Sequence, residues 1–560
     1  MTLVKLRVND VRVSLIKEKT LKECVADKLG IRKSALRNVQ ALHRAVDARR
    51  KNNIGLLYHV LAEVEAPQSV CQKLVKHPGV NLFVPAMQEP LQLGEIPLEE
   101  RPVVIGAGPA GLVAALELAR HGYRPLVLER GRKLRQRVSD VDRFWKTGQF
   151  DPVSNVQFGM GGAGTFSDGK LTTRVNDPVM TDILQAFVKA GAPSEILTEH
   201  KPHVGTDKLR AMVEGLAAEI ESCGGEIRCE TQVVDFITKE NCLVGLALAD
   251  GTMLKTEAVI LACGHSARDT YQALAARGFG MEGKPFSIGV RVEHPQSLID
   301  KAQYGDFAGH PRLGVADYAL VYHTADRKRA AYSFCMCPGG QVVAAASEAG
   351  GVVVNGMSLY KRDSGIANSA LVVNVTPEDF GCGPLDGVAF QRKYEKLAFA
   401  AGGGSYRAPA QSVTSFLEGK APSLKDAQQY LKETAALTAL QAGQQQEPAI
   451  ADRFPSYRPG VTEWALDTVL PSYVTDTLKE GIRYFGRRIQ GFDGPAGILT
   501  GVETRTSAPL RIVRGKDYQS ATHAGLYPCG EGCGYAGGIM SAALDGYHVA
   551  RAIIKKYKPF

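Results

Sequence analysis

Long hydrophobic runs are missing from this chain. None of its stretches approaches the ~18 consecutive apolar residues that a membrane-spanning helix needs, so we expect no transmembrane segment. The first residues, Met-Thr-Leu-Val-Lys-Leu-Arg, also lack the apolar core and small-residue cleavage site of a secretory signal. We therefore expect a cytoplasmic protein.

A cysteine framework is missing as well. Eleven cysteines occur in 560 residues, and no C-x-x-C motif is among them. The close pairs are Cys335/Cys337 and Cys529/Cys533, and neither spacing is that of a zinc site. Without a secretion signal this usage indicates reduced thiols rather than disulfides, and no bound metal.

The composition is that of a soluble globular enzyme, with 44% hydrophobic and 22% charged residues. A chain of this length exceeds one hydrophobic core, so two to four domains are expected. The net charge of +9 is uneven, because residues 1–66 hold 14 Lys and Arg against 7 Asp and Glu. Such a basic segment suits either an RNA partner or, more simply, a solvated surface.

The most informative segment begins with the apolar run Val103–Ile105, which predicts a buried parallel strand. Gly106, Gly108 and Gly111 follow as a G-x-G-x-x-G turn into a helix, and Glu129 ends the next strand 21 residues after Gly108. In this context the glycines allow the tight turn, the approach of a pyrophosphate and close helix–strand packing. The helix N-terminus attracts phosphate, and the acid accepts hydrogen bonds from a ribose diol. The segment predicts dinucleotide binding.

A second Gly-rich segment, near the C-terminus, narrows this prediction to FAD. Glu531 stands in a turn after a strand, and a helix starts at Gly537–Gly538. The acid can accept a hydrogen bond from the ribityl chain, and the positive end of the helix can stabilise anionic reduced flavin. The strand Ala258–Ala262, followed by Cys263 and Gly264, also passes close to the dinucleotide. FAD is long enough to reach both ends.

A third segment is unusually rich in glycine. Five glycines lie between residues 159 and 169, among them Gly161, Gly162 and Gly164. So many glycines favour backbone wrapped against a ligand, here the pyrophosphate or the isoalloxazine. A surface loop is the alternative.

The chain resembles known flavoproteins over nearly its whole length. Residues 100–275 and 500–560 are similar to the glutathione-reductase-like FAD superfamily, in the branch with a single Rossmann domain. The segments 335–358, 362–373 and 499–514 resemble, more narrowly, the family of uncharacterised FAD-dependent dehydrogenases. In that family a small N-terminal α/β domain precedes the flavin fold. The resemblance implies FAD and oxidoreductase activity and leaves the substrate open.

The resemblance also assigns roles by position. The G-x-G-x-x-G turn is expected to hold the pyrophosphate, Glu129 and Arg130 the adenosine, and Val233 the adenine through its backbone. Glu531 stands where many members of the superfamily have Asp. The full set of expected cofactor-binding residues is Gly106, Gly108, Pro109, Ala110, Gly111, Glu129, Arg130, Gly161, Gly162, Ala163, Gly164, Thr165, Val233, Cys263, Gly264, Glu531, Gly537, Gly538, Ile539 and Met540.

Catalytic residues are harder to predict, because the flavin performs the electron chemistry itself. The candidates are Lys170, Arg362 and Glu348, with His265 and the two thiol pairs beside them. Lys170 follows the glycine-rich segment 159–169, called the glycine loop below, and could approach the flavin. Arg362 could bind a carboxylate or phosphate of the substrate, or form an ion pair at the surface. Glu348 could take part in catalysis or only stabilise a turn. The thiol pair Cys529/Cys533 could exchange electrons with the flavin, but it is expected rather to fill space beside the cofactor. Cys335 and Cys337, if they lie on a strand, are expected to point to the same face, which is poor geometry for a disulfide between them.

The predicted fold is of mixed α/β and α+β class. A basic N-terminal domain (residues 1–95) precedes a discontinuous Rossmann-type FAD domain (residues 96–278 and 495–560). A substrate domain, β-rich and then helical, is inserted into the FAD domain at residues 279–494. In the N-terminal segment we expect a strand or hairpin at 3–15, a helix from Thr20 to Lys28, a second helix near Ser34, a strand at 54–64 and a proline-rich linker at 67–97. Further strands are expected at 125–129, 226–231, 233–238, 258–262, 286–293, 331–337, 341–346, 352–355 and 371–376.

Together these features predict an FAD-dependent dehydrogenase or reductase that acts on a small organic substrate by hydride transfer through flavin N5. With one dinucleotide fingerprint, NAD(P)H is expected to bind only transiently, if at all. One alternative is a flavoprotein that modifies or binds tRNA and holds it through the basic N-terminal domain. A further alternative is a non-catalytic, flavin-dependent scaffold or sensor.

Overall fold

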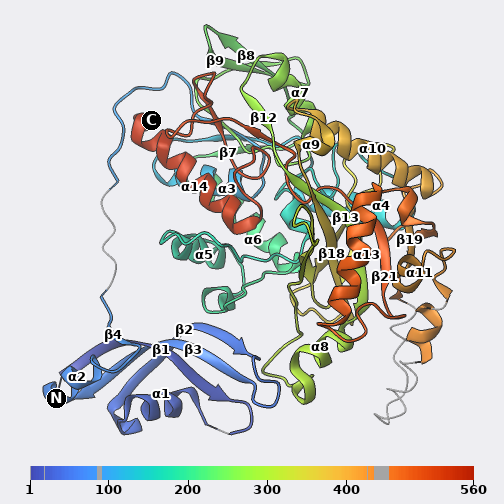
Figure 1. The fold of residues 1–560 in the computed structure, drawn as a ribbon. Coiled ribbons are helices and arrows are strands. Elements are labelled where there is room, and N and C mark those ends of the chain that lie inside the picture. Colours follow the sequence, from blue (N-terminus) through green and yellow to red (C-terminus); the bar gives the residue numbers. More distant parts are fainter. Residues whose placement is uncertain (1, 18, 85–90, 426, 434–452) are drawn as a thin grey trace. The chain divides into compact units, whose positions relative to one another are not determined.

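The computed structural model describes residues 2–17, 19–84, 91–425, 427–433 and 453–560, and its ribbon is drawn in Figure 1. The chain divides into two compact units. Unit 1 comprises residues 1–91, 193–203 and 300–316, and unit 2 comprises 92–192, 204–299 and 317–560. No helix among the described residues is long and apolar enough to cross a membrane.

Unit 1 contains an antiparallel sheet in the order β2-β3-β1-β4. Its strands are β1 (Thr2–Ser14), β2 (Leu36–Asp47), β3 (Gly55–Ala66) and β4 (Val80–Leu82). The helices α1 (Leu21–Leu29) and α2 (Gln68–Leu74) contribute to its apolar core. Thr20 and Glu23 form a capping box that fixes the start of α1, which confirms that prediction.

Two predictions for this unit are wrong. The segment near Ser34 is not a second helix but a single 3-10 turn, Lys33–Ala35, that leads directly into β2. Pairing of β2 with β3 overrides the local helix signal. The proline-rich segment also contains structure, because Pro67 starts α2 and β4 pairs with β1. Residues 85–90 of the predicted linker lie outside the described residues.

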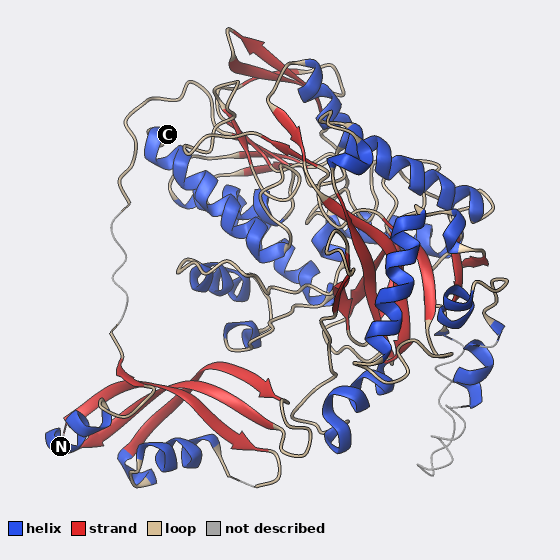
Figure 2. Ribbon diagram, viewed as in Figure 1, coloured by secondary structure: helices blue, strands red, loops and turns tan. Residues whose placement is uncertain are grey.

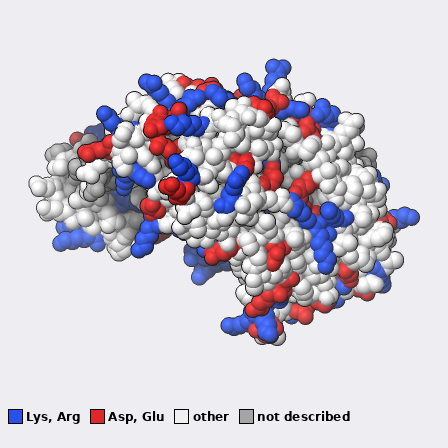
Figure 3. Space-filling view, turned by 90° about the horizontal axis from the view of Figure 1, so that it is seen from above, with Lys and Arg blue, Asp and Glu red and all other residues white. Residues whose placement is uncertain are grey.

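Seven of the 14 basic side chains in residues 1–66 form ion pairs with acids of the same unit. The ion pairs are Lys5–Glu63, Arg12–Asp47, Lys19–Asp27, Lys33–Glu23, Arg37–Glu65, Arg44–Glu199 and Arg49–Asp47. Figure 3 views the molecule from above, and on that face positive and negative side chains lie interspersed. The ion pairs of unit 1 favour a solvated surface for the paired half of its basic side chains.

Unit 2 contains a five-stranded parallel sheet in the order β23-β11-β5-β6-β7. Its strands are short and apolar: β5 (Val103–Ile105), β6 (Leu126–Leu128), β7 (Glu226–Arg228), β11 (Val259–Leu261) and β23 (Leu526–Pro528). Helix α3 (Pro109–Arg120) follows β5, and the C-terminal helix α14 (Ile539–Lys556) lies beside it (Figure 1). Parallel pairing places the carboxyl ends of β5, β11 and β23 at one edge, where ligands bind in such folds.

The second large sheet of unit 2 has seven strands in the order β14-β15-β18-β13-β21-β19-β20. These are β13 (Phe286–Pro295), β14 (Val321–His323), β15 (Ala330–Cys337), β18 (Ile366–Val375), β19 (Ala408–Ser412), β20 (Val461–Glu463) and β21 (Ile498–Glu503). Its pairs are antiparallel except β19–β20, and α13 (Ser472–Gly486) packs on one face (Figure 2). Strand β21 pairs with the central strand β13, although the sequence boundary at 494/495 groups it with the nucleotide-binding segment.

Smaller elements complete unit 2. An antiparallel sheet consists of β8 (Val233–Lys239), β9 (Cys242–Leu248) and β10 (Met253–Lys255). Two further sheets have two strands each: β16 (Gly340–Ala344) with β17 (Val354–Ser358), and β12 (Met281–Gly283) with β22 (Leu510–Ile512). The remaining helices are α4 (Leu134–Thr147), α5 (Met180–Lys189), α6 (Thr206–Ser222), α7 (Arg268–Ala276), α8 (Gln296–Tyr304), α9 (Pro377–Phe380), α10 (Asp386–Ala401) and α11 (Val413–Glu418). The predicted mixed fold, with a Rossmann-like parallel sheet and additional antiparallel sheets, is confirmed.

Candidate functional site

The turn between β5 and α3 depends on two of its glycines. Gly106 has a φ of +102°, and a Cβ there would lie 2.3 Å from the carbonyl oxygen of Ala262. A Cβ on Gly111 would lie 1.9 Å from the carbonyl oxygen of Gly106. Neither position tolerates a side chain, so the turn and the helix close tightly behind the ligand-facing residues.

A cavity of about 410 Å³ opens at this edge of the parallel sheet. Its walls come from the β5–α3 turn, the ends of β6, β11 and β23, the glycine loop, and strands β15 and β17 of unit 2. The cavity brings together these predicted cofactor residues: Gly106, Gly108, Pro109, Ala110, Glu129, Arg130, Gly162, Ala163, Gly164, Val233, Cys263, Gly264, Glu531, Gly537, Gly538 and Ile539.

Four of the predicted cofactor residues do not line the cavity. These are Gly111, Gly161, Thr165 and Met540. Gly111 packs against the turn, and a Cβ on Gly161 would lie 2.2 Å from the Thr165 hydroxyl oxygen. Met540 is buried, one residue beyond the start of α14. The structure therefore places these residues behind the cavity wall.

Glu129 has a structural task beside the one expected for it. Its two carboxylate oxygens accept backbone N–H groups of Ala107, Gly131 and Gly159, each at 2.9 Å. The side chain is buried yet borders the cavity. One carboxylate thus ties the β5–α3 turn to the glycine loop.

Arg137, on α4, is a residue that the sequence analysis missed. Its guanidinium is fully buried and donates to the carbonyl oxygens of Asn155, Val156, Gly159, Met160 and Gly162 at 2.8–3.2 Å. Burial lowers the pKa of Arg137 to about 10, which leaves it charged at neutral pH. The glycine loop therefore wraps around a buried cation. A lone Arg on an amphipathic helix gave no sequence signal for this.

The other end of the cavity matches the expectation for a flavin. Helices α3 and α14 both start at glycines, Gly108 and Gly538, that provide no side-chain cap. A Cβ on Gly264, Gly537 or Gly538 would meet no atom within 4 Å, so these residues face open space. Two helix starts without a side-chain cap suit a pyrophosphate and an electron-rich pyrimidine edge. These residues fit the long, anionic FAD molecule.

Glu531 lies in this cavity too. Burial raises the pKa of its carboxyl to about 7, with Lys284 opposing the shift. A carboxyl near neutrality can either donate or accept a hydrogen bond to a ribityl hydroxyl. The longer side chain, in place of the common Asp, still reaches the cavity.

The three catalytic candidates separate. Lys170 lines the cavity and lies 3.9 Å from the carboxylate of Asp168. Arg362 does not line it and instead binds Asp168 through Nε and Nη2. Glu348 is also outside the lining and forms ion pairs with Arg268 and Arg392.

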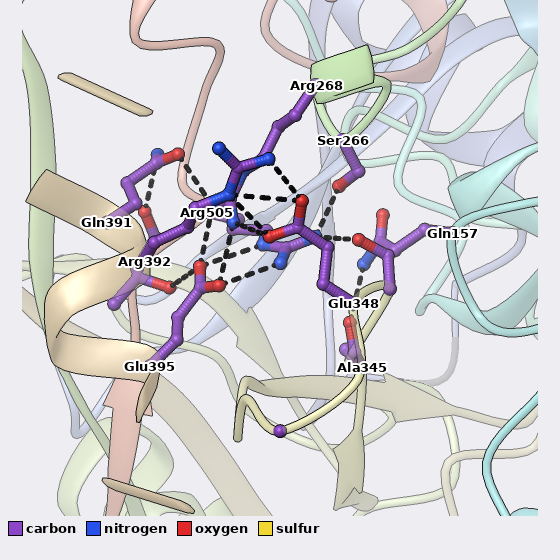
Figure 4. Close-up of polar contacts among 12 residues, drawn as sticks. Gln157, Ser266, Arg268, Ala345, Glu348, Gln391, Arg392, Glu395 and Arg505 are labelled. Atoms are coloured by element: carbon purple, nitrogen blue, oxygen red, sulfur yellow. Dashed lines mark hydrogen bonds and ion pairs between the residues drawn. The ribbon is translucent and has the colours of Figure 1, made fainter. Parts of the chain in front are cut away.

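The Glu348 pairs belong to a buried network of charges (Figure 4). Glu395, on α10, accepts from Arg268 at 2.7 Å and from Arg505 at 2.9 Å, and both guanidiniums hold its carboxyl pKa well below the usual range. Arg505 lines the cavity and also donates to Ser266. Because all three groups are buried, breaking one partner would leave an uncompensated charge. The network fixes Arg505 at the cavity wall.

The thiol pairs also separate. Cys335 and Cys529 line the cavity, whereas Cys337 and Cys533 lie behind the wall. The Cys533 thiol donates to the carbonyl oxygen of Leu261 at 3.2 Å. All eleven cysteines are free.

The chain matches known protein families over most of its length. Residues 285–443 and 437–506 match a family described as FAD-dependent protein, C-terminal domain-like. Residues 100–270 match the pyridine nucleotide-disulphide oxidoreductase family, and residues 5–63 match a domain of unknown function. The fold and these matches define an FAD-dependent oxidoreductase.

The chain belongs to the same family as an uncharacterized protein of Clostridium beijerinckii, to which it is 43% identical over 555 residues, 99% of each chain. Protein FixC of Escherichia coli O157:H7 is 24% identical over 257 residues, which cover 39% of this chain and 51% of that protein. Among solved structures, L-proline dehydrogenase from P. horikoshii aligns with a TM-score of 0.37 at 12% identity, over 82% of this chain and 94% of that one.

Proposed function

We propose that this protein is an FAD-dependent dehydrogenase or reductase in which hydride passes between a small organic substrate and flavin N5. The observation that supports this most is the single cavity wall shared by the β5–α3 turn, Glu129, Glu531 and the start of α14. These residues are separated by some 400 positions in the chain, yet they surround a space with the donors and acceptors that FAD needs. FAD supplies the electron chemistry.

Within this proposal, the residues of the chain have distinct tasks. The uncapped starts of α3 and α14 bind the pyrophosphate and the pyrimidine edge, and Glu129 with Val233 lies at the adenosine end. Lys170 holds a positive charge or a proton at the cavity, and Arg505 is kept in place by Glu395. We also propose that the protein belongs to the single-Rossmann branch of the glutathione-reductase-like superfamily, that it binds NAD(P)H transiently and that it is located in the cytoplasm.

The absorption spectrum of the purified protein tests the cofactor assignment, and anaerobic titration with NADH and NADPH tests the donor. Gly538→Val should weaken FAD binding at least about tenfold, because its side chain enters open space in the cavity. Gly283→Val is a matched control, since a Cβ there meets nothing within 3.7 Å and the residue lies outside the cavity lining. Protein that neither carries nor takes up flavin would refute the proposal.

A further inference from the structure

The strand that carries Cys335 and Cys337 is irregular at this point. In the β15–β18 pairing, Phe334 lies opposite Ala370 and Cys337 opposite Asn368, so one extra residue is inserted in β15. Cys335 has a φ of +45°, a conformation that disfavours any side chain. Regular alternation would point both thiols to one face, but the bulge ends that alternation. Cys335 lines the cavity and Cys337 lies buried behind it.

Strain of this kind is not what space filling requires. A cavity-lining position with positive φ would be relaxed by glycine, whereas this chain places a thiol there. Backbone outliers held by the surrounding structure cluster at functional sites. The bulge therefore positions the Cys335 side chain at the cavity.

Charged side chains of both signs lie near the thiol pair: Arg291 and Lys170, and the acids Asp168 and Glu503. The fully buried Arg291 donates to the carbonyl oxygen of Cys335 at 3.4 Å and lies 3.8 Å from Cys337 Sγ. It is held by Glu503, which also lines the cavity. The Cys337 thiol donates to the carbonyl oxygen of Cys335 at 3.3 Å. Interaction with Cys337, with Lys170 and Arg291 nearby, lowers the pKa of the Cys335 thiol below its ordinary value, and interaction with Cys335 and burial raise the pKa of Cys337. These directions favour the thiolate at Cys335 and the thiol at Cys337.

We propose that Cys335 and Cys337 form a redox-active dithiol, a second two-electron centre that exchanges electrons with the flavin. This proposal rests on the proposed function. In the oxidising direction, the thiolate of Cys335 and the thiol of Cys337 form one S–S bond and release two electrons and one proton. Oxidised FAD accepts both electrons and the proton, so charge and atoms balance. The reverse direction regenerates the thiolate and the thiol.

The pair differs from the other close cysteines in the described structure. Cys529 lines the same cavity, but burial raises its pKa well above the ordinary value, and Asp545 adds to the shift. The Cys533 thiol is engaged with Leu261. Thiolate character is what makes a cysteine reactive. Reactivity is therefore expected at Cys335 and not at Cys529.

The test is an anaerobic reductive titration of the air-oxidised holoenzyme. Wild-type protein should take up about two electrons more per flavin than Cys335→Ser or Cys337→Ser. The exposed Cys382 provides the control, and Cys382→Ser should match wild type. Uptake that is equal in wild type and both thiol variants would overturn the proposal.

A second measurement needs no variant. After air oxidation, acid quench and denaturation, Cys335 and Cys337 of the wild-type holoenzyme should resist alkylation and become accessible after reduction. Full alkylation of both without reduction would contradict the proposal even if a variant failed to fold. Failure of the proposed function would be recognised by a different result, namely that the purified protein shows no flavin absorption spectrum.

Discussion

Replacement of Arg137 by Met removes the buried cation around which the glycine loop is wound. Five backbone carbonyl oxygens between residues 155 and 162 lose the guanidinium N–H that they accept, although those of Gly159 and Gly162 keep a backbone N–H donor. A hydrogen bond from a charged group contributes roughly 1.5–3 kcal/mol, and a buried acceptor left without a partner costs roughly 1–3 kcal/mol. Water that enters the loop recovers part of this loss. We therefore expect Arg137→Met to lower the free energy of unfolding by roughly 3–5 kcal/mol.

The same substitution should weaken FAD binding, because Gly162 and its neighbours at the cavity lose their fixed position. Urea denaturation of the holoenzyme measures stability, and flavin fluorescence measures affinity. Arg135→Met is the matched control, since Arg135 lies exposed on the same helix and should change stability by less than about 0.5 kcal/mol. Equal stability and equal FAD affinity of the two variants would refute this account of the loop.

Three further predictions follow from single residues or segments. Glu129 accepts three backbone N–H groups, and in Glu129→Gln the amide NH₂ cannot accept any of them. We expect this variant to lose roughly 2–4 kcal/mol of unfolding free energy and to bind FAD more weakly. The exposed Glu221→Gln is the control, and wild-type FAD affinity of Glu129→Gln would disprove this role. Burial raises the pKa of Glu293 from 4.5 to about 7; the native state then binds more protons between these values, so stability should fall by about 3 kcal/mol as pH rises through that window. Urea denaturation from pH 4 to 8 should show a fall about 3 kcal/mol smaller in Glu293→Gln than in wild type, because Glu531, whose pKa is also raised to about 7, contributes to both profiles; parallel profiles would contradict it. Finally, a solvated basic surface on unit 1 predicts no salt-dependent retention of the chain on immobilised tRNA, whereas retention with a steep salt dependence would support the RNA alternative.

Part of the fold could be predicted from local patterns. The capping box at Thr20, the apolar strand before Gly106 and the β-branched runs at 286–293 and 371–376 each specify their element through short-range chemistry. The segment near Ser34 failed, because strand pairing with β3 outweighs its helix signal. The boundary at 494/495 did not anticipate β21, since pairing with β13 is a long-range event that no local pattern reports.

The candidate site divides in the same way. Residues tied to a motif, such as Gly108, Glu129 and Glu531, could be predicted because backbone approach and phosphate binding demand fixed spacings. Arg505 could not be predicted, because its partners Glu395 and Ser266 lie 110 and 239 residues away. Arg137 could not be predicted either, because no motif connects it with the backbone carbonyl oxygens 18 to 25 residues further along the chain. Glu348 was a candidate for chemistry, and the structure shows it in ion pairs outside the cavity lining.

Local patterns are sufficient to predict FAD, because this cofactor needs a strand–turn–helix with its acid and a second helix start, and both are short in sequence. Which side chains form ion pairs, which carboxylates accept backbone N–H groups and which thiol lines the cavity follow from the three-dimensional fold. Those outcomes depend on burial and on contacts between segments hundreds of residues apart. A bulge of one residue in β15 decided that Cys335 faces the cavity while Cys337 lies behind it.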